Sequence, residues 1–282
     1  MTKLRAWLLM GVLTMLLVFI GQMVGGRSGA MLFFIIALGM NFVSYFFSDK
    51  IALAMTGAQE LHEHESPELF AMVRRLSQRA GIPMPRIYRT PSPQPNAFAT
   101  GRSPAHSAVA VTDGLMQILN RAEVEGVLAH EIAHIKNRDV LVATLAASLA
   151  GAITMIANAL QWGLIFGGSD DEEGGAGILG LLGTLLLIIL APIAAMLIQL
   201  AISRAREYGA DETGAKLAGT PEGLASALLK LEQAAHHVPM QVNPATSHLF
   251  IVNPLSGQSL AALFSTHPPI QERVARLRAM RY

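Results

Sequence analysis

Two histidines and a glutamate in the segment HEIAH, residues 130–134, have a spacing that suits metal chemistry. On an α-helix, His130 and His134 project from the same face because they are four residues apart, so both can bind one metal ion. Glu131 lies beside them, where its carboxylate can hold a water molecule next to the metal and accept its proton. Ordinary surface or core residues are the alternative, but the spacing H-E-x-x-H seldom arises by chance. The segment therefore predicts a hydrolytic zinc site.

Four long stretches of the chain carry no charged residue and are predicted to be membrane segments, which must position this motif. The chain has 282 residues, of which 52% are hydrophobic and 15% charged, and its mean hydropathy is +0.42. This composition predicts a membrane protein with a soluble part rather than an ordinary soluble domain. Each stretch is long enough to cross a hydrocarbon core of roughly 30 Å as a helix. The stretches comprise residues 6–26, 28–48, 140–169 and 174–203.

Turn sequences group these stretches into two helical hairpins. The first hairpin turns at GGRSG and the second at GGSDDEEGGAG. A cleaved signal peptide is the alternative for the first stretch, but another apolar stretch follows it in place of a polar mature region. We therefore expect hairpins at residues 1–48 and 140–203, and a soluble domain assembled from residues 49–139 and 204–282.

The positive charges are distributed unevenly over this topology. Of the 21 lysines and arginines, only Arg27 lies in a hairpin turn, and the second turn carries four acidic residues at 170–173. The positive-inside rule then places both termini and the soluble domain, with the predicted active site, in the cytoplasm. The net charge of +1 provides no strongly basic face for nucleic acid.

Local patterns predict the elements of the soluble domain. Apolar residues at helical spacing, a Ser-Pro start and a final glycine predict an amphipathic helix over residues 66–81. Asn120 and Glu123 have the spacing of a capping box at the start of a helix that carries both histidines of HEIAH to the membrane. Two short strands are expected at residues 97–100 and 107–116. Further helices are expected at residues 203–219 and 220–237, and from the prolines at 268–269 to the C-terminus.

The hairpin topology narrows the search for a third metal ligand. A catalytic zinc ion normally has three protein ligands and one open position. Because the chain lacks cysteine, the third ligand must be His, Asp or Glu. The second hairpin leaves just after His134 and returns at residue 203, so we expect Glu207 close to the histidines. Asp211, four residues later, can accept the second N–H of a ligand histidine. Two solvated acids on a membrane-proximal helix are the alternative.

Several of these motifs, in this order, resemble a known family. HEIAH before a long hydrophobic hairpin, followed by SRAREYGADETGA and STHPPIQERV, is similar to the HtpX group of bacterial inner-membrane zinc metalloproteases. These are relatives of the membrane proteases that process CAAX prenyl proteins. The resemblance extends over essentially the whole chain, including the approach to PNAFATG. It implies that His130, His134 and Glu207 bind one zinc ion per chain and that Glu131 is the general base.

The resemblance also implies a fold and a role. The expected fold is a mainly α membrane protein, in which four transmembrane helices in two hairpins anchor a cytoplasmic α+β domain. That domain is expected to be zincin-like, of the gluzincin type, with a small sheet that has an exposed edge. The expected role is endopeptidase activity at the bacterial inner membrane, in the quality control of misfolded membrane proteins under stress. The expected partners are therefore polypeptide substrates and the lipid bilayer.

Residues outside the zinc motif are candidates for handling the substrate. His267 is a candidate donor to the oxyanion that forms at the scissile carbonyl, with Arg273 behind it. A structural histidine and a solvated helical face are the respective alternatives. An exposed strand edge can bind an extended peptide through main-chain hydrogen bonds. The resemblance places that edge at Asn96, Ala97 and Phe98, with residues 107–112 as a second candidate edge and a turn as the alternative role of Asn96.

Two other classes of protein compete with the enzyme. A zinc transporter is expected to place ionisable groups inside its spans, and the four predicted spans contain none. A zinc-stabilised scaffold or chaperone-like binder needs a fourth protein ligand, and the sequence offers no good candidate. The enzyme is therefore the preferred interpretation, although the sequence indicates neither a particular substrate nor an oligomeric state.

Overall fold

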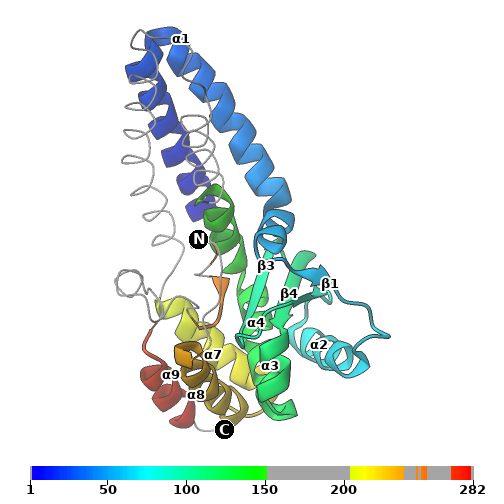
Figure 1. Cartoon of the computed structure of the whole chain (residues 1–282). Coiled ribbons are helices and arrows are strands. Elements are labelled where there is room, and N and C mark those ends of the chain that lie inside the picture. Colours follow the sequence, from blue (N-terminus) through cyan, green and yellow to red (C-terminus); the bar gives the residue numbers. More distant parts are fainter. Residues whose placement is uncertain (1, 151–203, 238–245, 247–248, 253–267, 281–282) are drawn as a thin grey trace.

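A helical hairpin forms the N-terminal part of the computed structural model, which describes residues 2–150, 204–237, 246, 249–252 and 268–280. Helix α1 (Thr2–Met55) folds back at Gly26, where φ is +57°, so that its two arms lie side by side (Figure 1). Asn41 on the second arm donates a hydrogen bond from Nδ2 to Oγ1 of Thr14 on the first arm, at 2.8 Å. The hairpin expected around GGRSG is therefore present in the structure.

The number of membrane spans differs from the expectation. Among the described residues, Gly26–Met55 is the one helical stretch that is long and apolar enough to cross a bilayer. The first arm, Ala6–Gln22, and the helix Val140–Ala150 are apolar but shorter. The second predicted hairpin falls on residues 151–203 and so lies outside the described residues. Four transmembrane helices are therefore not supported, although the outer surface of α1 suits lipid because it exposes side chains such as Trp7 and Phe42.

A small mixed sheet stands below the hairpin. Its strand order is β1-β2-β4-β3, with β2 and β4 parallel and the other two pairs antiparallel. Strand β3 therefore lies at an edge and β4 lies between two partners, so the suggestion that residues 107–112 form an exposed edge is wrong. The strands are β1 (Gln59–Glu60), β2 (Arg86–Thr90), β3 (Ala97–Ser103) and β4 (His106–Thr112).

The second predicted strand ends earlier than the sequence pattern indicated. Residues 113–116 begin helix α3 (Asp113–Ile118), because the side chain of Thr112 accepts a hydrogen bond from the backbone N–H of Leu115. A threonine that caps a helix in this way satisfies one of the free N–H groups of the first turn. The local capping interaction thus outweighs the β propensity of the preceding valines.

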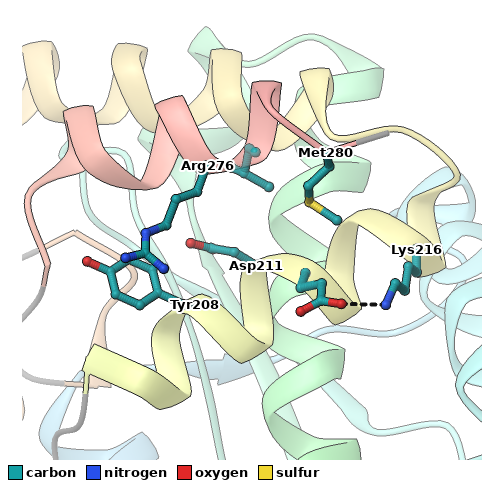
Figure 2. Close-up of a pocket in the computed structure, with 7 residues that line it drawn as sticks. Tyr208, Asp211, Lys216, Arg276 and Met280 are labelled. Carbon is teal, nitrogen blue, oxygen red and sulfur yellow. Dashed lines mark hydrogen bonds and ion pairs between the residues drawn. The ribbon is translucent and has the colours of Figure 1, made fainter. Parts of the chain in front are cut away.

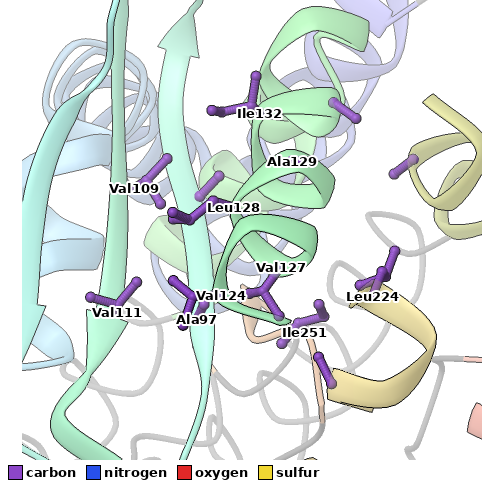
Figure 3. Packing of buried hydrophobic residues seen from close by; sticks show 14 of the residues in the cluster. Ala97, Val109, Val111, Val124, Val127, Leu128, Ala129, Ile132, Leu224 and Ile251 are labelled. Atoms are coloured by element: carbon purple, nitrogen blue, oxygen red, sulfur yellow. The ribbon is translucent and has the colours of Figure 1, made fainter. Parts of the chain in front are cut away.

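Helix α4 (Arg121–Asn137) lies at the centre of the soluble part, between the sheet and the C-terminal helices. Figure 3 shows Leu128 and Ile132 facing β3 and β4, while Leu224 comes from the opposite side. Asn120 and Glu123 form the predicted capping box at its start. The surrounding helices are α2 (Pro67–Ala80), α7 (Arg204–Ala218), α8 (Glu222–His237) and α9 (Ile270–Arg278).

The metal-motif helix does not continue into the next apolar segment. Helix α4 ends at Asn137, and Arg138 adopts a left-handed conformation with φ of 60°. A new helix begins at Val140. The expectation that one helix carries both histidines to the membrane is therefore wrong, since a break of two residues separates the motif from the apolar segment.

Candidate metal centre

Helix α4 carries His130, Glu131 and His134 within the protein interior. The backbone of α4 is anchored on both sides by apolar residues of the core, so these polar side chains are held in a buried environment. His130 and Glu131 are only 1% and 2% exposed. Buried polar groups that are retained in this way need partners or a ligand, since their desolvation is otherwise unfavourable.

Helix α7 brings Glu207 to the two histidines. The Nε2 atom of His134 lies 3.2 Å from Nε2 of His130 and 3.4 Å from Oε1 of Glu207. The Nε2 atom of His130 lies 3.9 Å from Oε2 of Glu207. One ligand atom from each of the three residues therefore faces a common point.

These three residues fit a zinc ion. Two imidazole nitrogens and one carboxylate oxygen form a donor set that catalytic zinc commonly uses, and their atoms lie within 4.8 Å of one another. A tetrahedral ion with bonds of about 2.0–2.1 Å places its ligand atoms about 3.3 Å apart. The two Nε2 atoms are 3.2 Å apart, and each lies 3.4 or 3.9 Å from a different carboxylate oxygen of Glu207, so the separations are close to that value.

Each histidine has a carboxylate at its other ring nitrogen. The Nδ1 atom of His130 lies 2.9 Å from Oδ1 of Asp211, and that of His134 lies 3.4 Å from Oδ2 of Asp139. Such contacts fix the tautomer and orientation of a ligand histidine, so that Nε2 is left for the metal. Asp211 is the residue predicted for this role, whereas Asp139 was not predicted, although its position directly before the apolar segment at Val140 is a signal in the sequence.

The contact between α4 and α7 depends on a glycine. A methyl group added at Gly214 would lie 2.9 Å from both the backbone N and Cα of His130. Real side chains do not approach a backbone so closely, so the absence of a side chain lets α7 lie against the ligand-bearing turn of α4. This close approach brings Glu207 and Asp211 within reach of the histidines.

Arg273 on α9 is a buried part of the site rather than a solvated residue. Its side chain is 0% exposed, and it bonds both carboxylate oxygens of Asp211 at 2.9 and 2.7 Å. It also lies 3.6 Å from Oε2 of Glu207. The solvated-face alternative is therefore wrong, and Arg273 is engaged with acids of the site rather than presented to a substrate.

Burial and neighbouring charges together set the pKa values of the groups at the site. Burial lowers the pKa of His130 to about 4 and raises that of Glu131 to about 7. Burial also disfavours the charged form of His134, but Asp139 and Glu207 outweigh it and raise the pKa to about 10. For Asp211, Arg273 likewise outweighs burial and lowers the pKa to about 2. The pocket is therefore arranged for a cation among acids.

Glu131 lies between the metal ligands and the edge of the sheet. Burial has the largest effect and raises the pKa of Glu131, while the nearby charges of His134 and Arg273 and the backbone of Ala99 on β3 favour its ionised form. A carboxylate with a pKa near 7 can both accept and release a proton at neutral pH. Its position next to a strand edge suits a base that acts on an extended peptide.

The predicted substrate edge is already in use within the chain. The Asn96 side chain donates to the carbonyl of Val252 at 2.7 Å and accepts from the backbone N–H of Ala97 at 3.1 Å. Asn96, Ala97 and Phe98 are all buried. The Asn96 amide is therefore engaged with Val252 and Ala97 in this structure, and its contact with a substrate backbone stays a prediction. His267, the candidate oxyanion donor, lies outside the described residues.

A separate pocket of about 400 Å³ opens between α7 and α9 (Figure 2). Asp211 is among its lining residues, but none of the three candidate ligands is. Its two cations do not form an anion site, because Lys216 pairs with Glu212 and Arg276 pairs with Glu272. The Arg276 guanidinium also stacks on the ring of Tyr208, 3.8 Å from its centre. We therefore assign the chemistry to the histidine cluster alone.

A buried His-His-Glu cluster, with an adjacent glutamate at a strand edge, defines a metalloprotease of the zincin-like class. The sequence comparison agrees, since the profile described as peptidase family M48 matches residues 63–281. The chain belongs to peptidase family M48 and is a metalloprotease. The non-catalytic scaffold raised by the sequence finds no support.

Curated relatives named "Protease HtpX homolog" match the chain along its whole length. The protein from Pelotomaculum thermopropionicum is 66% identical, with 99% of each chain covered. That from Syntrophobacter fumaroxidans is 57% identical, again with 99% of each chain covered. The relative from Pyrococcus furiosus is also 57% identical, over 97% of this chain and 94% of its own. The resemblance to the HtpX group is therefore confirmed.

A solved structure shares the fold. The crystal structure of S. mikatae Ste24p superposes with a TM-score of 0.51 and 21% sequence identity. The match covers 98% of this chain but 62% of that protein, so the chain spans less than two thirds of its length. The likeness confirms the zincin-like fold with its mixed sheet.

Proposed function

We propose that this protein is a zinc-dependent endopeptidase of the cytoplasmic membrane that hydrolyses misfolded or membrane-associated proteins. The observation that carries the proposal is the convergence of His130, His134 and Glu207 beside the buried carboxylate of Glu131. Three ligands of this kind leave an open position on a tetrahedral ion, as catalysis requires.

The chain's own residues divide the chemical work. Zinc, when bound, lowers the pKa of a water molecule and polarises the scissile carbonyl. Glu131 accepts the proton of the attacking water and passes it to the leaving amine nitrogen, for which a pKa of about 7 is well suited. Asp211 and Asp139 hold the imidazoles of His130 and His134 in position.

Two features support a membrane substrate. Helix α4, which carries the metal motif, ends at Asn137, three residues before the apolar helix that begins at Val140. The hairpin α1 exposes large hydrophobic side chains along both arms. We infer that α1 and the second predicted hairpin anchor the chain as a multi-pass protein, with both termini and the site in the cytoplasm. The site then meets unfolded chains at the membrane face, where quality control of misfolded membrane proteins takes place.

Cleavage of an unfolded protein by detergent-purified enzyme tests the proposal. We expect zinc-loaded protein to cut an unfolded substrate at internal bonds, and 1,10-phenanthroline to stop it. The non-chelating isomer 1,7-phenanthroline is the matched control and should leave cleavage unchanged. Release of single terminal residues alone would contradict the endopeptidase, and cleavage that is insensitive to chelation would contradict the metal mechanism.

A further inference from the structure

A short segment of the chain, Leu249–Val252, lies against the outer edge of β3. Phe98 and Phe250 form an antiparallel bridge, and the backbone N–H of Ile251 donates to the carbonyl of Ala97 at 3.0 Å. The Phe98 and Phe250 rings meet edge to face, with centres 5.1 Å apart, and both side chains are 0% exposed. The segment thus occupies the position of a further strand at this end of the sheet.

The same edge leads directly to the proposed base. The carbonyl of Asn96 points toward β4, where it accepts from the N–H of Thr112. Main-chain groups of successive residues in a strand point to alternate sides, so those of Ala97, Ala99 and Gly101 point away from β4, toward the open edge of the sheet. The carbonyl of Ala97 accepts from the N–H of Ile251, and the backbone of Ala99 lies close enough to the Glu131 carboxylate to lower its pKa. The bridged residue Phe98 is therefore directly followed on β3 by Ala99, the residue nearest the proposed base.

An extended substrate needs these outward groups. Strand addition to a sheet edge gains its affinity from main-chain hydrogen bonds, and only the outward-facing groups of β3 can supply them beside Glu131. The N–H of Gly101 is also engaged, with Oγ1 of Thr144 at 3.2 Å. A substrate strand that lies across the site therefore competes with the Leu249–Val252 segment for Ala97.

We propose that Leu249–Val252 is an internal strand that occupies the substrate-binding edge of β3 and must dissociate from it before an extended peptide can be cleaved. This inference rests on the proposed endopeptidase function. It assigns the structure a self-inhibited state, in which the chain itself satisfies the edge that a substrate will use. The alternative is a permanent strand, with the substrate confined to the edge beyond Ala99.

Side chains, more than main-chain bonds, hold the segment in place. The Asn96 amide donates to the carbonyl of Val252 and accepts from its N–H, at 2.7 and 3.3 Å. Arg273 donates from Nη1 to the carbonyl of Ile251 at 3.3 Å. The same guanidinium binds Asp211, which contacts His130, so the segment is connected to a candidate metal ligand through two residues. Departure of the segment frees a donor of Arg273 beside the site.

A disulfide across the bridge tests the proposal. The chain contains no cysteine, so a Phe98→Cys/Phe250→Cys variant can form only that one intramolecular disulfide. Residues directly opposite in an antiparallel bridge have Cβ atoms about 4.5–5.5 Å apart, close enough for a disulfide after a small adjustment. We expect the oxidised, zinc-loaded variant to lose at least about tenfold in cleavage of an unfolded protein, and to recover when reduced with a phosphine, which spares the zinc.

The outcomes separate this inference from the function on which it rests. The cysteine-free parent, treated with the same oxidant and phosphine, should not change. Equal cleavage by the oxidised and reduced variant, at equal zinc content, overturns the internal strand alone. Absence of cleavage by the zinc-loaded parent overturns the proposed function, and the inference falls with it.

A single substitution provides a second test that does not require the disulfide. Phe250→Ala weakens the hold of the segment and should lower KM for an extended peptide by about tenfold, with kcat unchanged. Leu53→Ala is the matched control, because Leu53 belongs to the same buried cluster but lies on α1. An unchanged or higher KM in Phe250→Ala contradicts the proposal, as does an equal fall in KM for Leu53→Ala.

Discussion

The Nδ1 atom of His130 lies 2.9 Å from Oδ1 of Asp211, and this contact joins α4 to α7 at the centre of the candidate site. Asp211 is held in turn by two hydrogen bonds from Arg273 on α9. Because all three side chains are buried, each helix fixes the next, and the Nε2 atom of His130 lies 3.2 Å from that of His134. The packing of the three helices therefore fixes the positions of the side chains at the metal site.

Removal of the third ligand should release the metal. Glu207→Ala leaves two histidines, which is one ligand fewer than a catalytic zinc site normally has, and we expect zinc to be lost on dialysis against a weak chelator. Metal content measured by atomic emission checks this. Glu212→Ala, on the same helix but exposed and paired with Lys216, should retain stoichiometric zinc. Equal retention by both variants would contradict the assignment of Glu207.

The carboxylate that contacts His134 should tune zinc affinity. Asp139→Asn keeps the size of the side chain but removes its charge, and we expect zinc affinity to fall by about 10–100-fold. Competition with a chromophoric chelator at fixed pH measures this. Asp113→Asn is the control, because Asp113 pairs with Arg89 on the sheet. If Asp139→Asn binds zinc as tightly as the parent, Asp139 does not orient His134.

The glycine at the helix contact should be intolerant of a side chain. Gly214→Ala forces a methyl group against the backbone of His130, so we expect a loss of about 1–3 kcal/mol in the free energy of unfolding, with weaker zinc binding. Gly209→Ala, in the same helix with no atom within 4 Å of the added group, should be neutral or stabilising by up to about 1 kcal/mol. Denaturant unfolding in detergent compares the two, and equal stabilities would contradict the close contact.

The buried arginine should be essential to stability. Arg273→Met leaves the charge of Asp211 without its partner, and we expect the free energy of unfolding to fall by about 3–5 kcal/mol. Addition of Asp211→Asn should recover part of that loss, because the unpaired charge is then absent. Arg276→Met, on the exposed face of α9, should change stability by about 1 kcal/mol or less. A loss no larger than that of Arg276→Met would contradict the buried pair.

Local signals account for the part of the fold that the sequence predicted. The capping box of Asn120 and Glu123, the amphipathic pattern of α2 and the glycine at residue 81 act within a few residues of chain, and each appears in the structure as expected. The proximity of Glu207 to the histidines follows from chain order rather than from any local pattern, since the two ends of a predicted hairpin must lie together.

Other features could not be predicted because they depend on tertiary packing. Arg273 lies in the buried stripe of α9 with Ile270, Val274 and Leu277, a spacing of three and four residues that the sequence does contain. An arginine in such a stripe is the signal that was overlooked. The pairing of Leu249–Val252 with β3 has no comparable signal, since a register between segments so distant along the chain is set only when the whole core assembles.

Substitution of the proposed base tests the central claim most directly. Glu131→Gln preserves the shape of the side chain and the three candidate ligands, so zinc content should match that of the parent. Cleavage of an unfolded protein should fall by about 10²–10⁴-fold, because no carboxylate then accepts the proton of the attacking water. Glu125→Gln, on the same helix but paired with Arg75, is the matched control and should cleave normally. Cleavage by zinc-loaded Glu131→Gln at the parental rate would contradict the account.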